Sequence, residues 1–122
     1  MKIQESAENY LEAILMIQRE KGNCRSIDVA QFLGFSKPSV SRAMSLLREN
    51  GYVVMDNIRL LTLTESGREI AERIFERHQL LTEWLIRLGV SPETAQADAC
   101  RIEHVISVES FDHIKKHISQ TD

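Results

Sequence analysis

Residues 26–51 read SIDVAQFLGFSKPSVSRAMSLLRENG, and this stretch decides the fold. Apolar residues recur at helical spacing on both sides of Gly34, and Ser26 and Ser36 stand where helix N-caps are expected. Pro38 falls in the first turn of the second helix, where its missing N–H needs no partner. Two short helices joined by a glycine-containing turn predict a helix-turn-helix.

The next residues, YVVMDNIRLLTLT at 52–64, predict a β-hairpin. Tyr52–Met55 and Ile58–Thr62 are rich in residues that favour strands, and the turn-forming pair Asp56-Asn57 separates them. A hairpin directly after a helix-turn-helix is the pattern of a winged helix, so we expect residues 1–72 to form a winged helix-turn-helix DNA-binding domain.

The rest of the chain predicts further helices. An apolar face before Gly22 indicates a first helix, and a long helix runs from a cap at Thr64 to Gly89. Ser91 and Ser107 then open two more helices. The fold class is therefore mainly α with a small β-hairpin wing, in which residues 73–122 form a helical dimerisation and metal-binding domain. A homodimer suits DNA half-sites; the alternative is a monomer with a slightly larger core.

Charge is unevenly distributed along the chain. The formal net charge is −3, yet residues 21–48 hold five basic residues and one acidic residue, so the remainder is acidic. A basic segment can face DNA while the acidic part collects cations; the alternative is an ordinary solvated surface. The N-terminus has no signal-peptide pattern and no window is apolar enough to cross a membrane, so we expect a cytoplasmic protein without membrane partners.

One short segment carries three metal-binding residue types. Cys100, Glu103 and His104 occur at positions i, i+3 and i+4, so they project from one side of a helix. Helical geometry predicts that they flank the apolar stripe formed by Ala95, Ala99, Ile102 and Ile106. A thiolate, a carboxylate and an imidazole together favour a first-row transition metal. The alternative is a buried cysteine beside an exposed Glu-His pair.

Three segments together resemble the diphtheria-toxin repressor and manganese transport regulator family: Asn9-Tyr10-Leu11-Glu12, Arg77-His78 and residues 100–104, CRIEH. The family consists of dimeric, metal-activated repressors of metal-uptake genes. Taken position by position, the resemblance implies six metal ligands: Cys100, Glu103, His104, His78, Glu12 and Asn9. Without it, Asn9 and Glu12 would be solvent-facing and His78 a structural hydrogen-bonding residue.

The implied ligand set mixes two branches of that family. Cys100 is similar to the iron-type branch, whereas Glu12 is similar to the manganese-type branch. Asn9 matches neither branch, and Thr82 and Gln96 replace ligands of the ancillary site in the iron-type branch. The resemblance and the ligand chemistry imply a divalent transition metal, Mn(II) or Fe(II), as cofactor.

On the second helix of the helix-turn-helix, the polar residues lie near its N-terminal end, away from the apolar stripe. The residues we expect to bind DNA are Ser36, Lys37, Ser39, Arg42 and Arg59, the last from the wing. The alternative is a basic surface that reads no bases. We expect Cys24 to be structural, and His113 and His117 to be solvent-exposed despite their i, i+4 spacing.

These patterns predict a metal-dependent transcriptional repressor that binds double-stranded operator DNA as a homodimer. The alternative is a winged-helix regulator gated by an organic ligand or a protein, in which Cys100 and His104 are incidental. An enzyme is not expected, because no nucleophile or second acid-base pair accompanies the metal-binding residues. For the same reason we expect no small organic substrate.

Overall fold

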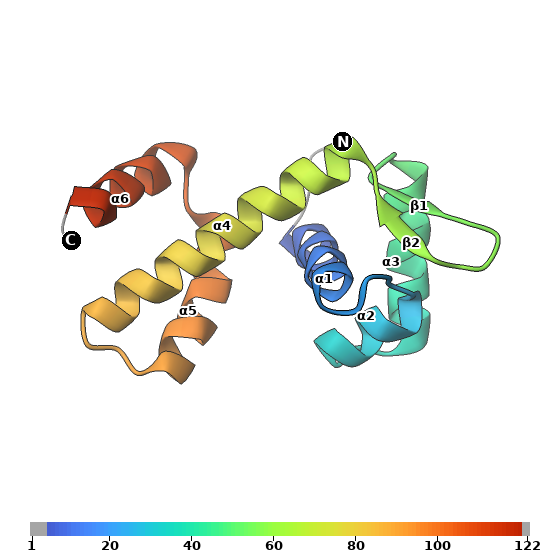
Figure 1. Cartoon of the computed structure of the whole chain (residues 1–122), viewed down its shortest axis with the longest axis horizontal. Coiled ribbons are helices and arrows are strands. Elements are labelled where there is room, and N and C mark those ends of the chain that lie inside the picture. Colours follow the sequence, from blue (N-terminus) through green and yellow to red (C-terminus); the bar gives the residue numbers. More distant parts are fainter. Residues whose placement is uncertain (1–4, 121–122) are drawn as a thin grey trace. The chain divides into compact units, whose positions relative to one another are not determined.

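The computed structural model describes residues 5–120 of the chain, which form two compact units divided between Glu72 and Arg73. The elements, in order, are α1 (Glu5–Lys21), α2 (Ser26–Leu33), α3 (Lys37–Glu49), β1 (Val53–Met55), β2 (Leu61–Leu63), α4 (Glu65–Arg87), α5 (Pro92–Val105) and α6 (Val108–Gln120). Figure 1 shows them in sequence colours. No helix in residues 5–120 is long and apolar enough to span a membrane.

The N-terminal unit is built around α1. Leu11, Ile14 and Leu15 of this helix are fully buried, in the same unit as Val40 and other buried side chains of α2, α3 and the hairpin. Each fully buried Leu or Ile contributes about 1.5–3 kcal/mol. The side chain of Gln18 on α1 donates a 3.1 Å hydrogen bond to the carbonyl oxygen of Leu61, which ties β2 to α1. The helix-turn-helix therefore packs on the buried apolar face of α1.

Local capping explains where α2 and α3 begin. Ser36 is the N-cap of α3 as predicted, and its Oγ accepts a hydrogen bond from the backbone N–H of Ser39. The prediction for α2 is wrong by one residue, because its N-cap is Arg25 and Ser26 is its first helical residue. There the Asp28 carboxylate accepts a 2.9 Å hydrogen bond from the Arg25 N–H. An acidic residue inside the helix thus replaces a serine cap.

The wing is shorter than the sequence predicts. Its second strand begins at Leu61, not at Ile58, and pairs antiparallel with β1. The side chain of Asp56 accepts hydrogen bonds from the backbone N–H groups of Ile58 and Leu60, at 3.0 and 2.9 Å. Arg59 takes a left-handed conformation, with φ +67°. The hydrogen bonds of the Asp56 side chain thus hold residues 58–60 in a loop, although their strand propensity predicted that they pair in the hairpin.

The C-terminal unit packs the second half of α4 with α5 and α6 (Figure 1). Leu81, Ala99 and Phe111, one from each helix, form its buried core. The predicted caps are present, since Ser91 is the N-cap of α5 and the Ser107 hydroxyl accepts a hydrogen bond from the N–H of Ser110. A helix-turn-helix with a hairpin wing, followed by a helical unit, confirms the predicted fold class.

The close packing of Gly67 against the backbone of Tyr52 leads to a prediction about stability. Gly67 lies in the first turn of α4 against the backbone of Tyr52, and an added Cβ would overlap the Tyr52 carbonyl oxygen. That oxygen also accepts the N–H of Thr64, so it cannot move freely. We expect Gly67→Ala to lower the free energy of unfolding by about 1–3 kcal/mol or more through overpacking. Urea unfolding measures it against Ser66→Ala, an exposed change in the same turn. Equal midpoints for the two variants would contradict the account.

Candidate metal centre and DNA interface

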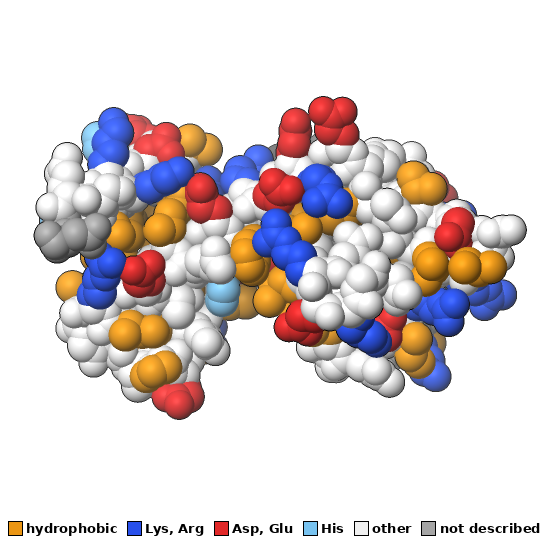
Figure 2. All heavy atoms as spheres, in the orientation of Figure 1, with side chains coloured by type: hydrophobic (Ala, Val, Ile, Leu, Met, Phe, Trp, Pro, Cys, Tyr) orange, Lys and Arg blue, Asp and Glu red, His pale blue; other side chains and the backbone are white. Residues whose placement is uncertain are grey.

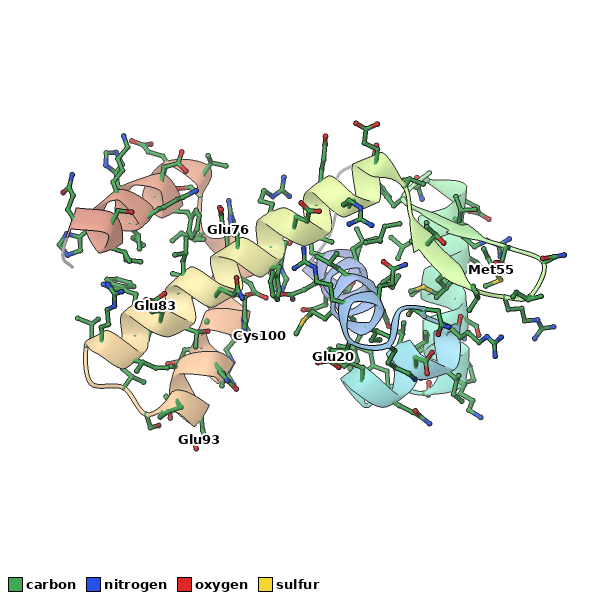
Figure 3. The ribbon with its side chains drawn as sticks, viewed as in Figure 1. Glu20, Met55, Glu76, Glu83, Glu93 and Cys100 are labelled. Carbon is green, nitrogen blue, oxygen red and sulfur yellow. The ribbon has the colours of Figure 1, made fainter. Side chains whose placement is uncertain are left out.

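Four of the predicted metal ligands come together inside the C-terminal unit. The ligand atoms of Cys100, Glu103 and His104 all lie within 4.8 Å of one another, as their spacing on α5 predicts. His78 joins them from α4, with its Nδ1 2.9 Å from Oε2 of Glu103. Figure 3 labels Cys100 on α5, the helix that supplies three of these four side chains.

The carboxylate of Glu103 is the most constrained group of the cluster. The residue is fully buried, and its Oε1 has no hydrogen-bond partner in the part of the chain that the structure describes. His104 Nε2 approaches that oxygen to 3.4 Å. A buried carboxylate is costly unless positive charge or hydrogen bonds compensate both oxygens. One oxygen here therefore still offers a lone pair to a cation.

This burial corrects one expectation from the sequence. Glu103 lies beside the apolar stripe of α5, as expected, but it is fully buried together with Ala95 and Ala99 and not exposed. Cys100 is exposed, so the alternative of a buried cysteine beside an exposed Glu-His pair is wrong. The reason is His78, whose imidazole gives a carboxylate on this face a polar partner that helical periodicity cannot reveal.

The residues present fit a transition metal. A thiol, a carboxyl group and two imidazoles supply the mixed S, O and N donors that bind Mn(II), Fe(II), Co(II) or Zn(II). The second oxygen of Glu103, buried beside His104, has the environment in which a cation would supply the missing compensation. The donor chemistry therefore agrees with a divalent ion at this place.

The two remaining predicted ligands lie on α1, in the N-terminal unit. Glu12 is buried, which does not match the solvent-facing alternative, and Asn9 is half-buried. They lie three residues apart on the helix, so both can face the same side. Their participation in the metal site stays a prediction.

Thr82 and Gln96 line a hollow in the C-terminal unit together with His78. Both offer neutral donors, and the buried Thr82 hydroxyl has no hydrogen-bond partner in residues 5–120. A neutral hydroxyl and amide hold a divalent cation much less strongly than carboxylate or imidazole. We therefore still expect no ancillary site of the iron type here.

The predicted DNA-binding residues lie on the surface of the N-terminal unit. Lys37 and Arg42 on α3 are exposed, as are Ser36 at its N-cap and Arg59 in the wing loop, while Ser39 is half-buried. Figure 2 shows several Lys and Arg side chains on the part of the surface formed by α2, α3 and the hairpin. The structure thus presents the basic segment to solvent.

Two further residues of this surface were not predicted from the sequence to bind DNA. Arg25 and Ser41 line a hollow between the start of α2, α3 and the wing, together with Arg59. Their signal is weak in the sequence, because Arg25 counts only toward local charge and Ser41 belongs to no motif. A hollow with two arginines suits a backbone phosphate.

The residues expected to lie outside the site do so. Cys24 is fully buried, and burial, followed by the nearby Asp28 charge, raises the pKa of its thiol to about 12. Such a buried thiol is shielded from reagents and ligands, which agrees with the structural role expected for Cys24. His113 and His117 are exposed on α6, as predicted.

Comparison with known proteins assigns both parts of the chain. Residues 2–59 match the N-terminal DNA binding domain of the iron dependent repressors, and residues 64–122 match their metal binding and dimerisation domain. The chain is also 39% identical over 108 residues to the transcriptional regulator MntR of Escherichia coli O6:H1, covering 88% of this chain and 70% of that protein. The chain belongs to the iron-dependent repressor family. The family resemblance seen in the sequence is confirmed.

Other members of the iron-dependent repressor family agree. The regulator MntR of Geobacillus kaustophilus is 38% identical, over 89% of this chain and 77% of that protein. A structure of a manganese-dependent transcriptional repressor in complex with manganese matches with TM-score 0.83 and 29% identity, over 93% of this chain and 52% of that chain. The regulator MtsR matches with TM-score 0.86 and 25% identity, over 95% of this chain and 54% of that chain. This repressor chain thus spans about half the length of those two structures.

The two cysteines of this repressor give a direct test of the site. We expect a maleimide reagent at neutral pH to modify Cys100 in the folded protein and to spare Cys24, because the Cys24 thiol is buried with a raised pKa. Mn(II) or Co(II) should slow the modification of Cys100. Mass spectrometry of the digested protein measures both, and Cys100→Ser is the control. Modification of Cys24 at the rate of Cys100, or no protection by any metal, would contradict this assignment.

Proposed function

We propose that this chain is a metal-dependent transcriptional repressor that binds operator DNA as a homodimer when loaded with Mn(II) or Fe(II), and that it controls metal homeostasis genes. The observation that carries this is the buried Glu103 carboxylate, grouped with Cys100, His104 and His78, in a chain that also presents a basic helix-turn-helix. A regulator of chromosomal genes in bacteria works in the cytoplasm. It carries out no catalysis.

The proposed ligands are Cys100, Glu103, His104, His78, Glu12 and Asn9. The first four are grouped in the C-terminal unit, while the family resemblance supports Glu12 and Asn9. When bound, the metal supplies a divalent positive charge for the carboxylate and thiolate donors. Cys100 favours iron, cobalt, nickel or zinc, while Glu12, Glu103 and Asn9 favour harder ions such as manganese. Cys100 and the histidines must be deprotonated to bind, so metal affinity should fall at acid pH.

The proposed ligand set links metal binding to DNA binding. The family resemblance implies that Glu12 and Asn9 of α1 bind the same ion as the α5 residues, so that metal binding would restrain the DNA-binding domain. A dimer with restrained units loses less conformational entropy when its two recognition helices dock on half-sites. The helix α1 carries both Glu12 and the buried apolar face on which the helix-turn-helix packs.

The proposed DNA contacts divide by chemistry. Arg42 is exposed on α3 and suits a guanine edge, while Ser39 suits a base edge close to the helix N-terminus. Lys37 and the backbone N–H groups near Ser36 suit a phosphate. Arg59, held in a left-handed conformation at the wing loop, suits the flanking DNA backbone.

DNA binding with and without metal tests the proposal. On a palindromic operator, fluorescence anisotropy should show tight binding in Mn(II) or Fe(II) and a loss of about tenfold or more in chelator. Glu103→Gln and Cys100→Ala should bind DNA weakly at metal concentrations that saturate the wild type. Lys116→Ala, an exposed charge on α6, is the control. Equal affinity in chelator and in every metal would refute the proposal. Metal-independent regulation by an added organic compound would favour the ligand-gated alternative.

A further inference from the structure

Arg77 is a buried cation beside the metal cluster, and the ligand chemistry does not use it. The residue lies on α4, directly before His78, and is 7% exposed. Its Nη1 donates hydrogen bonds to two backbone carbonyl oxygens, those of Glu103 and Ile106, each at 3.0 Å. A buried arginine is costly unless such partners compensate its charge.

Both carbonyl oxygens belong to the end of α5. The helix ends at Val105, and Ile106 is its C-cap residue in an extended conformation. The Glu103 carbonyl is among the last of the helix, which commonly lack intrahelical partners and carry the negative end of the helix dipole, so a cation at this place is stabilising. Arg77 therefore stabilises the last turn of α5, which carries Glu103 and His104.

Two consecutive residues of α4 contact Glu103, one at its backbone and one at its carboxylate. Arg77 donates to its backbone carbonyl oxygen, and His78 contacts its carboxylate at 2.9 Å. The hydrogen bond from Arg77 fixes the position of the Glu103 backbone, and the His78 imidazole fixes the position of its carboxylate. Without Arg77 the carboxylate would keep its contact with His78, but the Glu103 backbone would no longer be held in place.

An aromatic residue of α6 also contacts the Arg77 guanidinium. The Arg77 guanidinium carbon lies 5.3 Å from the centroid of the Phe111 ring, within the range of a cation–π contact. Phe111 is buried in the same core as Leu81 and Ala99. The position of the guanidinium thus depends on α6 being docked on α4 and α5.

We propose that Arg77 is a positioning residue for the metal site: it holds the ligand-bearing end of α5 in register with His78, and Phe111 couples that register to the docking of α6. The inference rests on the proposed function, in that the α5 cluster binds the metal. A planar guanidinium is suited to this role because it can donate in its plane while its face lies on an aromatic ring. Groups that orient metal ligands commonly change metal affinity by about 10–100-fold.

Cobalt binding without DNA tests this role. Co(II) added anaerobically to the full chain should produce a thiolate-to-metal absorption band and visible ligand-field bands, whose energies report coordination geometry. We expect Arg77→Met to weaken Co(II) binding by about tenfold or more and to shift the visible bands. Arg77→Lys, which keeps a cation, should recover part of the affinity, and Phe111→Leu should lose a smaller part.

The matched control is Arg101→Met, which removes an exposed positive charge on α5 next to Cys100. If Arg77→Met has the affinity and the visible spectrum of this control, the proposal is overturned. If circular dichroism shows that Arg77→Met does not fold, Arg77→Lys and Phe111→Leu decide, and control-like behaviour in both overturns it. A wild-type chain without a thiolate band would instead refute the metal site of the proposed function, and this inference with it.

Discussion

The buried carboxylate of Glu103 is the constraint around which the C-terminal unit is organised. It lies among apolar side chains of α5, where an unpaired charge would cost several kcal/mol. His78 contacts one oxygen, and the other lies 3.4 Å from His104 without a hydrogen-bond partner in residues 5–120. The contact between Glu103 and His78 thus aligns α4 with α5, and the second carboxylate oxygen is the atom at which the proposed cation would complete the charge compensation.

This arrangement separates the tasks of the two units. The N-terminal unit holds its basic residues on α3 and the wing and is stabilised by the apolar face of α1. In the C-terminal unit, the predicted metal ligands Cys100, Glu103, His104 and His78 are grouped on α5 and α4, and a small apolar core joins these two helices to α6. Family membership gives these units the roles of DNA binding and of metal binding with dimerisation. In the proposed function, such a division would let a change in metal concentration alter DNA affinity while the predicted base-reading residues stay the same.

The sequence predicts much of this fold because its signals are local. The caps at Ser36 and Ser91 and the hairpin after Gly51 follow from side chains that act within a few residues. The errors have a different origin. The loop closed by Asp56 competes with strand propensity, and the burial of Glu103 depends on His78, a residue 25 positions away on another helix. Arg77 was visible in a motif, but its hydrogen bonds to the end of α5 depend on tertiary packing.

The most direct test of the central claim is the location of the metal itself. Crystals grown with Mn(II) or Co(II) would give anomalous difference maps on both sides of the metal absorption edge, which identify the ion independently of the protein model. The account predicts a peak within about 2.0–2.4 Å of a Glu103 oxygen and of ligand atoms from Cys100 or His104. An ordered ion bound elsewhere, with the Glu103 carboxylate buried and uncoordinated, would contradict it.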